Sequence, residues 1–428
     1  MLSLTLLLLL ALLALSVAAA VSVGLLGMSL SQLFSGLPLS SAMGEIAWNT
    51  STEFLLVAIP LYILMGELLV CSGVAGRMYQ AVEKWLSWLP GGLMNANIGA
   101  SALFATTSGS SVATAATIST LAIPEQERKG YNAPLFLGSI AAGGTLGILI
   151  PPSINMILFA LIANVSVPRL YLAATIPSII LSLLFVALIV SACLVRPQLG
   201  GRKEHTAWAE RLACIPDLLP PLAIFTLVIG SIYSGFATAS ESAALGVLSA
   251  LGLGLWRRAL TWESLGQAFE ATLRTTGMII FITLSAFFLN FVLASIGLTT
   301  TLVNFVTELQ LSPTATLIAI VLFYVVLGCF MDTLAMLITT APLIVPIVVS
   351  LGFDPLWFGV VLIVLCEMGQ ITPPFGMNLF VVQSIRGRGK FIDVIYGALP
   401  FCLALLVLIA LLVLFPQIAL WLPNKFQA

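Results

Sequence analysis

Charged side chains are scarce in this sequence. Asp, Glu, Lys and Arg make up only 8% of its 428 residues, and the formal net charge is -1. A typical soluble globular domain has roughly 25% charged residues, so these are too few to cover a surface that faces water. The near-neutral balance also leaves no basic patch and no acidic tail, which makes nucleic acid an unexpected partner.

Histidine is nearly absent, and cysteines in paired spacing are missing. The single histidine, His205, stands in a polar loop without neighbouring metal ligands, so neither metal binding nor histidine-based catalysis is expected. The 6 cysteines are scattered without Cys-x-x-Cys spacing, which favours small buried side chains over a redox role. A serine protease built on the Ser-Gly-Ser-Ser run at 108–111 would need a base that no span supplies. Neither enzyme activity nor a cofactor is expected.

Apolar runs dominate what is present, since 60% of the residues are hydrophobic. Runs of the roughly 20 residues needed to cross a bilayer recur along the chain and predict an all-α polytopic membrane protein with an uncleaved first span. Two further apolar stretches, at about 95–122 and 312–350, carry polar centres and are expected to be re-entrant hairpins. Segments 76–90 and 259–274 mix Trp, charge and apolar residues, as interfacial or ordinary loop helices do. The expected spans lie at about 2–27, 54–71, 133–162, 172–195, 217–233, 236–256, 275–297, 356–383 and 391–415.

Positive charge orients these spans, because cytoplasmic loops carry an excess of Lys and Arg. The basic residues gather in the loops at 196–211, 257–258 and 386–390. Placing these loops in the cytoplasm puts the N-terminus inside and the C-terminus outside. The hairpin at 95–122 then enters from the cytoplasm, and the hairpin at 312–350 enters from outside.

The two halves of the chain match when they are aligned on their proline pairs. Pro151–Pro152 and Pro373–Pro374 lie 222 residues apart, and the same offset superposes the centres of the two hairpins. Because the hairpins enter from opposite sides, the sequence predicts two inverted-topology repeats, residues 1–216 and 217–428. Inverted repeats are typical of secondary transporters, whose binding sites lie at the repeat interface.

Helix breaks inside hydrocarbon expose backbone N–H and C=O groups at several kcal/mol each, so they persist only where protein, water or a ligand satisfies them. Duplicated breaks are therefore candidate binding sites, and the alternative is a kink packed by neighbouring helices. Hydroxyl, amide and carboxylate oxygens surround them and suit Na⁺ and a carboxylate or polyol. The predicted break residues are Gly144, Pro151, Pro152, Pro373, Pro374 and Gly376.

Asp332 is the carboxylate at the centre of the second hairpin. A carboxylate at mid-span costs at least about 2.5–3.5 kcal/mol, so Asp332 is expected to coordinate a cation, relay a proton or cap the hairpin. Single Ser and Thr residues in the hairpins serve equally well for close helix packing. Structural roles are expected for Glu67, Glu241 and Glu367, which also lie in or near spans.

Six long motifs resemble the large membrane subunit of tripartite ATP-independent periplasmic (TRAP) transporters, over nearly the full length. They are TSGSSVATAATI (107–118), IPEQERKGY (123–131), GTLGILIPPSINMILF (144–159), SESAALG (240–246), MDTLAMLITTAPLIVPI (331–347) and EMGQITPPFGMNLFVVQSI (367–385). The resemblance implies Na⁺-coupled import of a small organic acid across the bacterial inner membrane. It also implies two partners, a small four-helix membrane subunit and a periplasmic substrate-binding protein.

The same resemblance implies an elevator-type transporter, similar to the ion-transporter superfamily, in which the module that holds both hairpins slides against a fixed scaffold. A stand-alone Na⁺/dicarboxylate symporter of similar architecture is the alternative, and a passive channel is a further one. The Na⁺ candidates at the tips and breaks are Ser108, Gly109, Thr145, Gly147, Met331, Asp332, Gln370 and Thr372. The substrate candidates are Ser110, Ser153, Asn155, Asp332, Thr333 and Asn378.

Overall fold

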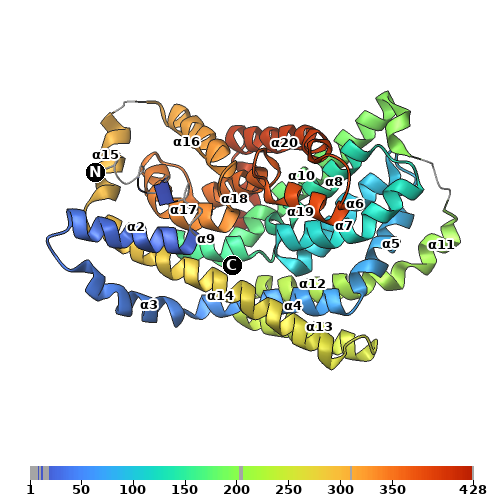
Figure 1. Ribbon diagram of the computed structural model, residues 1–428, viewed down its shortest axis with the longest axis horizontal. Helices are drawn as coiled ribbons and strands as arrows, with labels where there is room; N and C mark the ends of the chain where they lie inside the picture. The colour runs from blue at the N-terminus through green and yellow to red at the C-terminus, as the bar shows by residue number, and fades with distance from the viewer. Residues whose placement is uncertain (1–7, 9–10, 13–18, 202–205, 309–310, 427–428) are drawn as a thin grey trace.

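The computed structural model describes residues 8, 11–12, 19–201, 206–308 and 311–426. Among these residues, 7 helices are long and apolar enough to cross a membrane, or 8 when one bent pair counts as a single span. The helical architecture in Figure 1 confirms the predicted all-α polytopic chain. His205 and most of the predicted first span lie outside the described residues.

Helices of the first half match the predicted spans at 54–71, 133–162 and 172–195 closely, whereas α2 (Ala19–Phe34) continues beyond the predicted end of the first span at 27. A short 3-10 turn, η2 (Phe54–Val57), opens the predicted span at 54–71, and two more turns, η1 (Leu39–Ala42) and η3 (Pro197–Gly200), lie in loops. The α-helices are α2 (Ala19–Phe34), α3 (Met43–Ser51), α4 (Ala58–Cys71), α5 (Val74–Leu86), α6 (Gly92–Ser108), α7 (Ser111–Arg128), α8 (Ala133–Leu149), α9 (Ile154–Ala163) and α10 (Val167–Val195).

The second half has a corresponding series of helices. They are α11 (Trp208–Ala213), α12 (Ile215–Tyr233), α13 (Ala239–Trp256), α14 (Trp262–Ser295), α15 (Leu298–Glu308), α16 (Pro313–Gly328), α17 (Thr333–Ser350), α18 (Pro355–Ile371), α19 (Met377–Arg386), α20 (Phe391–Leu414) and α21 (Gln417–Lys425). The pairs α6–α7 and α16–α17 are helical hairpins, since a short turn joins two helices that contact each other. Their turns, residues 109–110 and 329–332, are called the first tip and the second tip below.

Helix bounds repeat along the chain with the offset found in the sequence. Adding 222 to the bounds of α7, 111 and 128, gives 333 and 350, which are the bounds of α17. The same shift carries α8, 133 to 149, onto α18, 355 to 371. The interruptions that follow these helices, at 150–153 and 372–376, therefore stand at equivalent positions.

One predicted boundary is wrong. The sequence suggests an interfacial or loop helix at 259–274 and a separate span at 275–297, whereas α14 runs unbroken from Trp262 to Ser295. Thr261 and Ser264 start this helix with a reciprocal capping box, in which each side chain accepts a hydrogen bond from the other residue's N–H. The change from charged to apolar composition does not interrupt backbone hydrogen bonding, so a single helix continues through it.

The centre of the molecule is formed by helices of both halves that cross each other. Helix α7 packs on α19, α17 packs on α9, and α8 packs on α18. Figure 1 shows α17, α18 and α19 in the middle, between α16 and α20 on one long side and α4, α13 and α14 on the other. Every residue of α18 from Leu356 to Ile371 is buried, so this helix is an interior one, and Glu367 and Gln370 are buried with its apolar residues.

Two glycines bring α8 and α20 into direct backbone contact. A Cβ atom on Gly138 would overlap the carbonyl group of Gly397, and a Cβ atom on Gly397 would overlap the carbonyl oxygen of Pro134. Small residues allow helix backbones to approach this closely in membranes, where van der Waals packing drives helix association. The helix that leads into the first break is therefore fixed against α20.

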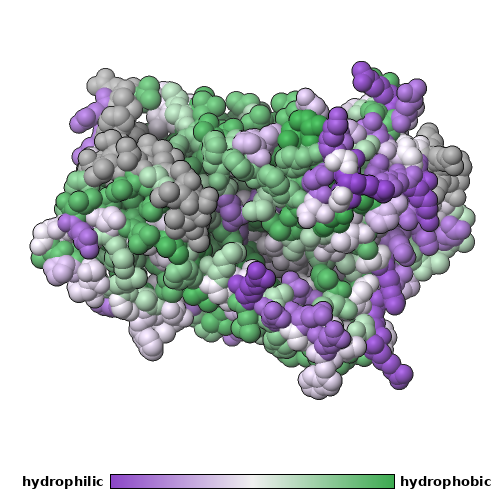
Figure 2. All heavy atoms as spheres, in the orientation of Figure 1, coloured by the Kyte–Doolittle hydropathy of each residue, from purple (hydrophilic) through white to green (hydrophobic). Residues whose placement is uncertain are grey.

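Hydrophilic residues gather at one end of the molecule. Figure 2 shows apolar residues over most of the visible face and polar residues toward the end that carries α5 and α11 in Figure 1. In this region Arg388 pairs with Glu127, and the N–H of Asn132 donates to the carbonyl of Leu199 at 3.4 Å. Two of the loops that the charge pattern assigns to the cytoplasm, 196–211 and 386–390, thus lie against the end of α7 and the residues that follow it.

Candidate functional site

Four helices start at the hairpin tips and helix breaks. Ser110, Ser153 and Asp332 precede α7, α9 and α17, and each side chain accepts a hydrogen bond from a backbone N–H two or three residues further on, at 3.4, 3.4 and 3.2 Å. Gly376 precedes α19 and has no side chain to offer. The N-terminal N–H groups of a helix favour an anion, and C-terminal carbonyls favour a cation. Each tip or break therefore presents both kinds of helix end.

The first tip lies against the first helix break. A Cβ atom on Gly109 would lie 3.1 Å from the carbonyl oxygen of Pro152, and a Cβ atom on Gly147 would lie 2.5 Å from the carbonyl oxygen of Ser110. The axes of α8 and α9 differ by 43° at this break. Backbone of the tip and backbone of the break thus meet without side chains between them.

The second tip lies against the end of α18 in a corresponding way. The Gln370 side-chain amide donates to Thr333 Oγ1 at 3.2 Å, and its Nε2 lies 3.5 Å from Asp332 Oδ1. The rings of Phe330 and Phe375 pack with their centroids 6.1 Å apart, which joins the tip to the break itself. Three predicted site residues, Asp332, Thr333 and Gln370, are therefore brought together.

A buried carboxylate links the first tip to α18. The Ser111 hydroxyl donates to Glu367, with its Oγ 2.9 Å from Oε1 and 2.8 Å from Oε2. Glu367 is 0% exposed. The sequence suggests only a structural role for Glu367, although its position three residues before Gln370 places both on one face of a helix. That spacing of two polar residues in an apolar span is the signal that could have indicated a site.

Three predicted site residues carry buried polar atoms without a hydrogen-bond partner within the described part of the chain. These atoms are Asn155 Nδ2, Gln370 Oε1 and Asn378 Oδ1. The other end of the Asn378 amide is fixed, because its Nδ2 donates to the carbonyl of Ala141 at 3.2 Å. An unpaired buried polar atom costs about 1–3 kcal/mol, and a bound ion or ligand is one way to remove that cost.

The remaining hydroxyl candidates are hydrogen-bonded to nearby groups. Thr145 and Thr372 donate to helical carbonyls, each at 2.6 Å. The Ser108 hydroxyl lies 2.8 Å from the hydroxyl of Thr114. Because these hydroxyl oxygens keep lone pairs after donating, they stay available as ligands. Met331 lies in the second tip itself, directly before Asp332.

Gly144 is not a break residue, contrary to the prediction. It lies inside α8, which is helical from Ala133 to Leu149. A Cβ atom on Gly144 would lie 2.8 Å from Ala115 Cβ and 2.9 Å from Asn378 Nδ2, so this glycine provides room for neighbouring elements. A single glycine costs a helix only about 1 kcal/mol, whereas the proline pair removes backbone donors and ends α8.

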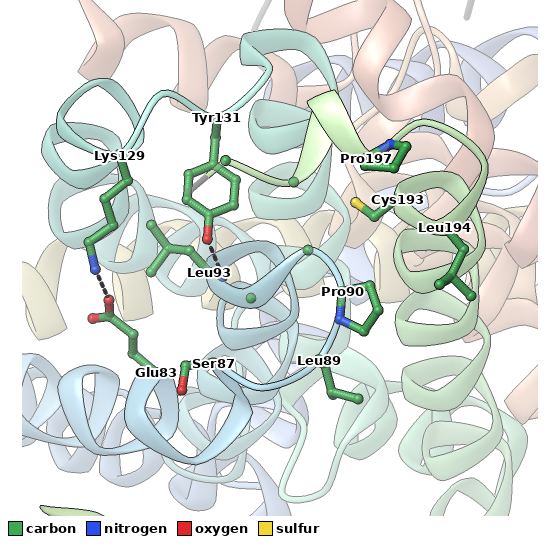
Figure 3. A pocket seen from close by; sticks show the side chains of 14 residues that line it. Glu83, Ser87, Leu89, Pro90, Leu93, Lys129, Tyr131, Cys193, Leu194 and Pro197 are labelled. Atoms are coloured by element: carbon green, nitrogen blue, oxygen red, sulfur yellow. Dashed lines mark hydrogen bonds and ion pairs between the residues drawn. The ribbon is translucent and has the colours of Figure 1, made fainter. Parts of the chain in front are cut away.

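A small cavity of about 140 Å³ lies elsewhere (Figure 3), between the start of α6, the residues that follow α7 and the end of α10. Lys129 points toward Glu83 and pairs with it, and the Tyr131 hydroxyl accepts a hydrogen bond from the N–H of Leu93 at 3.0 Å. The two charged residues of the lining thus neutralise each other. Nothing in this cavity marks it as a site for a charged substrate.

The Gly147 contact leads to a stability prediction. Replacing Gly147 by Ala is expected to destabilise the protein by about 1–3 kcal/mol, because overpacking at a backbone contact forces the first tip away from α8. Differential scanning fluorimetry in detergent would detect this as a lower Tm. The control is Gly252→Ala in α13, where an added Cβ meets nothing within 4 Å. Equal Tm values for both variants would contradict the contact.

An apolar chain of crossing helices, with two hairpin tips set against two interrupted helices, defines a multi-pass membrane transporter. The solved structure of the Alcanivorax borkumensis YdaH transporter has a similar fold, with a TM-score of 0.64 at 15% sequence identity, covering 96% of this chain and 98% of that one. The chain belongs to the family described as tripartite ATP-independent periplasmic transporter, DctM component, whose family model matches residues 6–418.

Curated relatives agree with this assignment over most of their length. The C4-dicarboxylate TRAP transporter large permease protein DctM of Pseudomonas aeruginosa is 33% identical over 94% of each chain. The sialic acid TRAP transporter large permease protein SiaM of Vibrio cholerae is 30% identical over 87% of each chain. The predicted TRAP family is therefore confirmed, and the protein is a permease of the bacterial inner membrane and not an enzyme.

Proposed function

We propose that this permease imports a small organic acid together with Na⁺, after a periplasmic binding protein has delivered the acid. The observation that carries the proposal is the meeting of each hairpin tip with an interrupted helix. These places supply helix ends of both signs within the membrane, which is how secondary transporters hold an anionic substrate and its coupling cation. In the second half, the oxygens of Asp332, Gln370 and Thr372 provide hard ligands for Na⁺.

Two independent observations support a small organic acid as the substrate. The relatives carry names that specify C4-dicarboxylate and sialic acid, both of which are acids. In this chain, Asn155 Nδ2 is a buried donor that no acceptor satisfies among the described residues, and it stands in the first turn of α9. A substrate carboxylate would accept from Asn155 and from the N–H groups at that helix start.

The proposed mechanism is an elevator. Residues 1–216 and 217–428 are inverted repeats, and α6–α7 and α16–α17 are re-entrant from the cytoplasm and from outside. The contacts of α7 with α19 and of α17 with α9 join the two hairpins and two interrupted helices into one moving module. Helices α2, α4, α13 and α14 contact each other as a second group and serve as the fixed scaffold. The small four-helix membrane subunit braces that scaffold.

A reconstituted system tests the Na⁺ coupling. Proteoliposomes that contain the permease, its small membrane subunit and the binding protein are expected to accumulate radiolabelled succinate or another acid bound by that protein. A tenfold inward Na⁺ gradient supplies about 1.4 kcal/mol for each Na⁺ carried. Dissipating the gradient with a Na⁺ ionophore is therefore expected to stop accumulation even when ATP is present.

Two alternatives predict different results in the same assay. A stand-alone symporter would accumulate the acid when the permease is reconstituted without either partner. A passive channel would equilibrate the acid at a rate that does not depend on the Na⁺ gradient. Either outcome would overturn the tripartite, Na⁺-coupled mechanism.

A further inference from the structure

One helix holds both hairpin tips. Ser111 and Thr333 are each the first residue of the helix that follows a tip, and they are equivalent under the offset of 222. Ser111 donates to Glu367, and Thr333 accepts from Gln370. Both partners belong to α18, one turn apart. The first residues of the helices that follow the two tips are thus hydrogen-bonded to neighbouring points on the same helical face.

The other half of the chain does not repeat this arrangement. Subtracting 222 from Glu367 and Gln370 gives Thr145 and Ile148 in α8, the helix equivalent to α18. The Thr145 hydroxyl donates to a carbonyl of its own helix, that of Ala142, and Ile148 has no polar side chain. The connection between the tips is therefore a departure from the repeat and is made by α18.

Stability alone does not explain why Glu367 is buried inside the bundle. Burying a carboxyl group is costly unless hydrogen bonds or an opposite charge compensate it. No salt bridge to Glu367 occurs among the described residues, and its hydrogen-bond partners there are the Ser111 hydroxyl and the backbone of Ile148. An ionisable residue inside a membrane bundle is by default a candidate for function. Its hydrogen bond with Ser111, directly after the first tip, indicates a function in positioning that tip.

We propose that Glu367 is a positioning residue that couples the two tips through Gln370, so that Na⁺ bound at one tip sets the geometry of the other. This inference rests on the proposed Na⁺-coupled function. A shift of the first tip moves Ser111 and Glu367, and one turn of rigid helix transmits it to Gln370 and Thr333. Such a connection makes Na⁺ binding cooperative, because two sites share one coupling free energy.

Direct binding of ²²Na⁺ to the purified permease with its small membrane subunit tests the coupling without a substrate. The wild type is expected to bind Na⁺ with a Hill coefficient above one. Glu367→Gln and Ser111→Ala each weaken the link, so the Hill coefficient is expected to fall to one. The half-saturating Na⁺ concentration is expected to rise, by about 5- to 150-fold for a coupling of ordinary size.

Ser119→Ala is the matched control. Ser119 lies on the same helix as Ser111, is 0% exposed, and its hydroxyl has no partner among the described residues, so the wild-type isotherm is expected. The Tm in choline chloride reports on folding alone. Because Gln keeps the shape of Glu367 and removes a buried acid, this Tm is expected to stay the same or rise.

The outcomes separate the coupling from the function on which it rests. No specific Na⁺ binding by the wild type would overturn the Na⁺-coupled function and the coupling together. Cooperative binding that persists in Glu367→Gln and Ser111→Ala would overturn the coupling alone, as would a wild-type Hill coefficient of one. If Glu367→Gln fails to fold, Ser111→Ala still tests the coupling, because it removes the donor of the same hydrogen bond.

Discussion

Replacing Asp332 by Ala is expected to lower the Na⁺ affinity of the permease at least about tenfold while the protein still folds. Asp332 is the carboxylate of the second tip, and its Oδ1 lies 3.5 Å from the Gln370 side chain. Interactions with a charged group contribute about 1.5–3 kcal/mol, and every 1.4 kcal/mol is a factor of ten. Equilibrium binding of ²²Na⁺ to the purified protein measures the effect.

The control separates ion binding from helix capping. Asp332 Oδ2 also accepts a hydrogen bond from the N–H of Leu334, at 3.2 Å. Asp354 caps α18 in the same manner, by accepting from Leu356 at 2.7 Å, but it is exposed. Asp354→Ala is expected to cost about 0.5–2 kcal/mol of stability, as the loss of a cap does, with normal Na⁺ affinity. Equal Na⁺ affinity in the two variants would mean that Asp332 is only a cap.

Gly397→Ala is expected to produce the largest loss of folded protein. Overpacking a core ordinarily costs about 1–3 kcal/mol. At Gly397 the new Cβ meets the backbone carbonyl of Pro134, so no side-chain rotation relieves the overlap and α20 must move away from α8. The yield of monodisperse protein in size-exclusion chromatography is expected to fall at least about tenfold.

A control glycine tests whether the loss of folded protein is caused by the contact between α8 and α20. Gly277 lies inside α14, where an added Cβ meets nothing within 4 Å, so Gly277→Ala is expected to fold as well as the wild type or better. A wild-type yield and Tm for Gly397→Ala would show that α8 and α20 are further apart than this structure places them.

Local chemistry allowed the interrupted helices to be located in advance. Proline has no backbone N–H and disfavours helical geometry in the residue before it. Because Pro220–Pro221 nevertheless lie inside α12, it was the duplication of Pro151–Pro152 and Pro373–Pro374 beside polar hairpins that marked the interruptions after α8 and α18. The internal offset of 222 then related the two halves without any structure. Most predicted spans follow from apolar length in the same direct way.

Contacts between distant segments could not be predicted. Ser111 and Glu367 are 256 positions apart, and nothing in either neighbourhood specifies the other as a partner. The role of Gly144 was wrong for a related reason, since a glycine that makes room for a neighbour resembles one that ends a helix. The surface helices α3 and α21 were also missed. Composition alone does not distinguish them from loops.

A cryo-EM comparison of the reconstituted complex in NaCl and in choline chloride tests most directly whether the paired tips and helix breaks form the transport site. Na⁺-dependent density is expected beside both tips, with one feature between Gly109 and the break at 150–153 and another beside Asp332 and Gln370. Density at neither tip, or ions bound only at the peripheral cavity lined by Glu83 and Lys129, would contradict the claim that paired tips and helix breaks form the transport site.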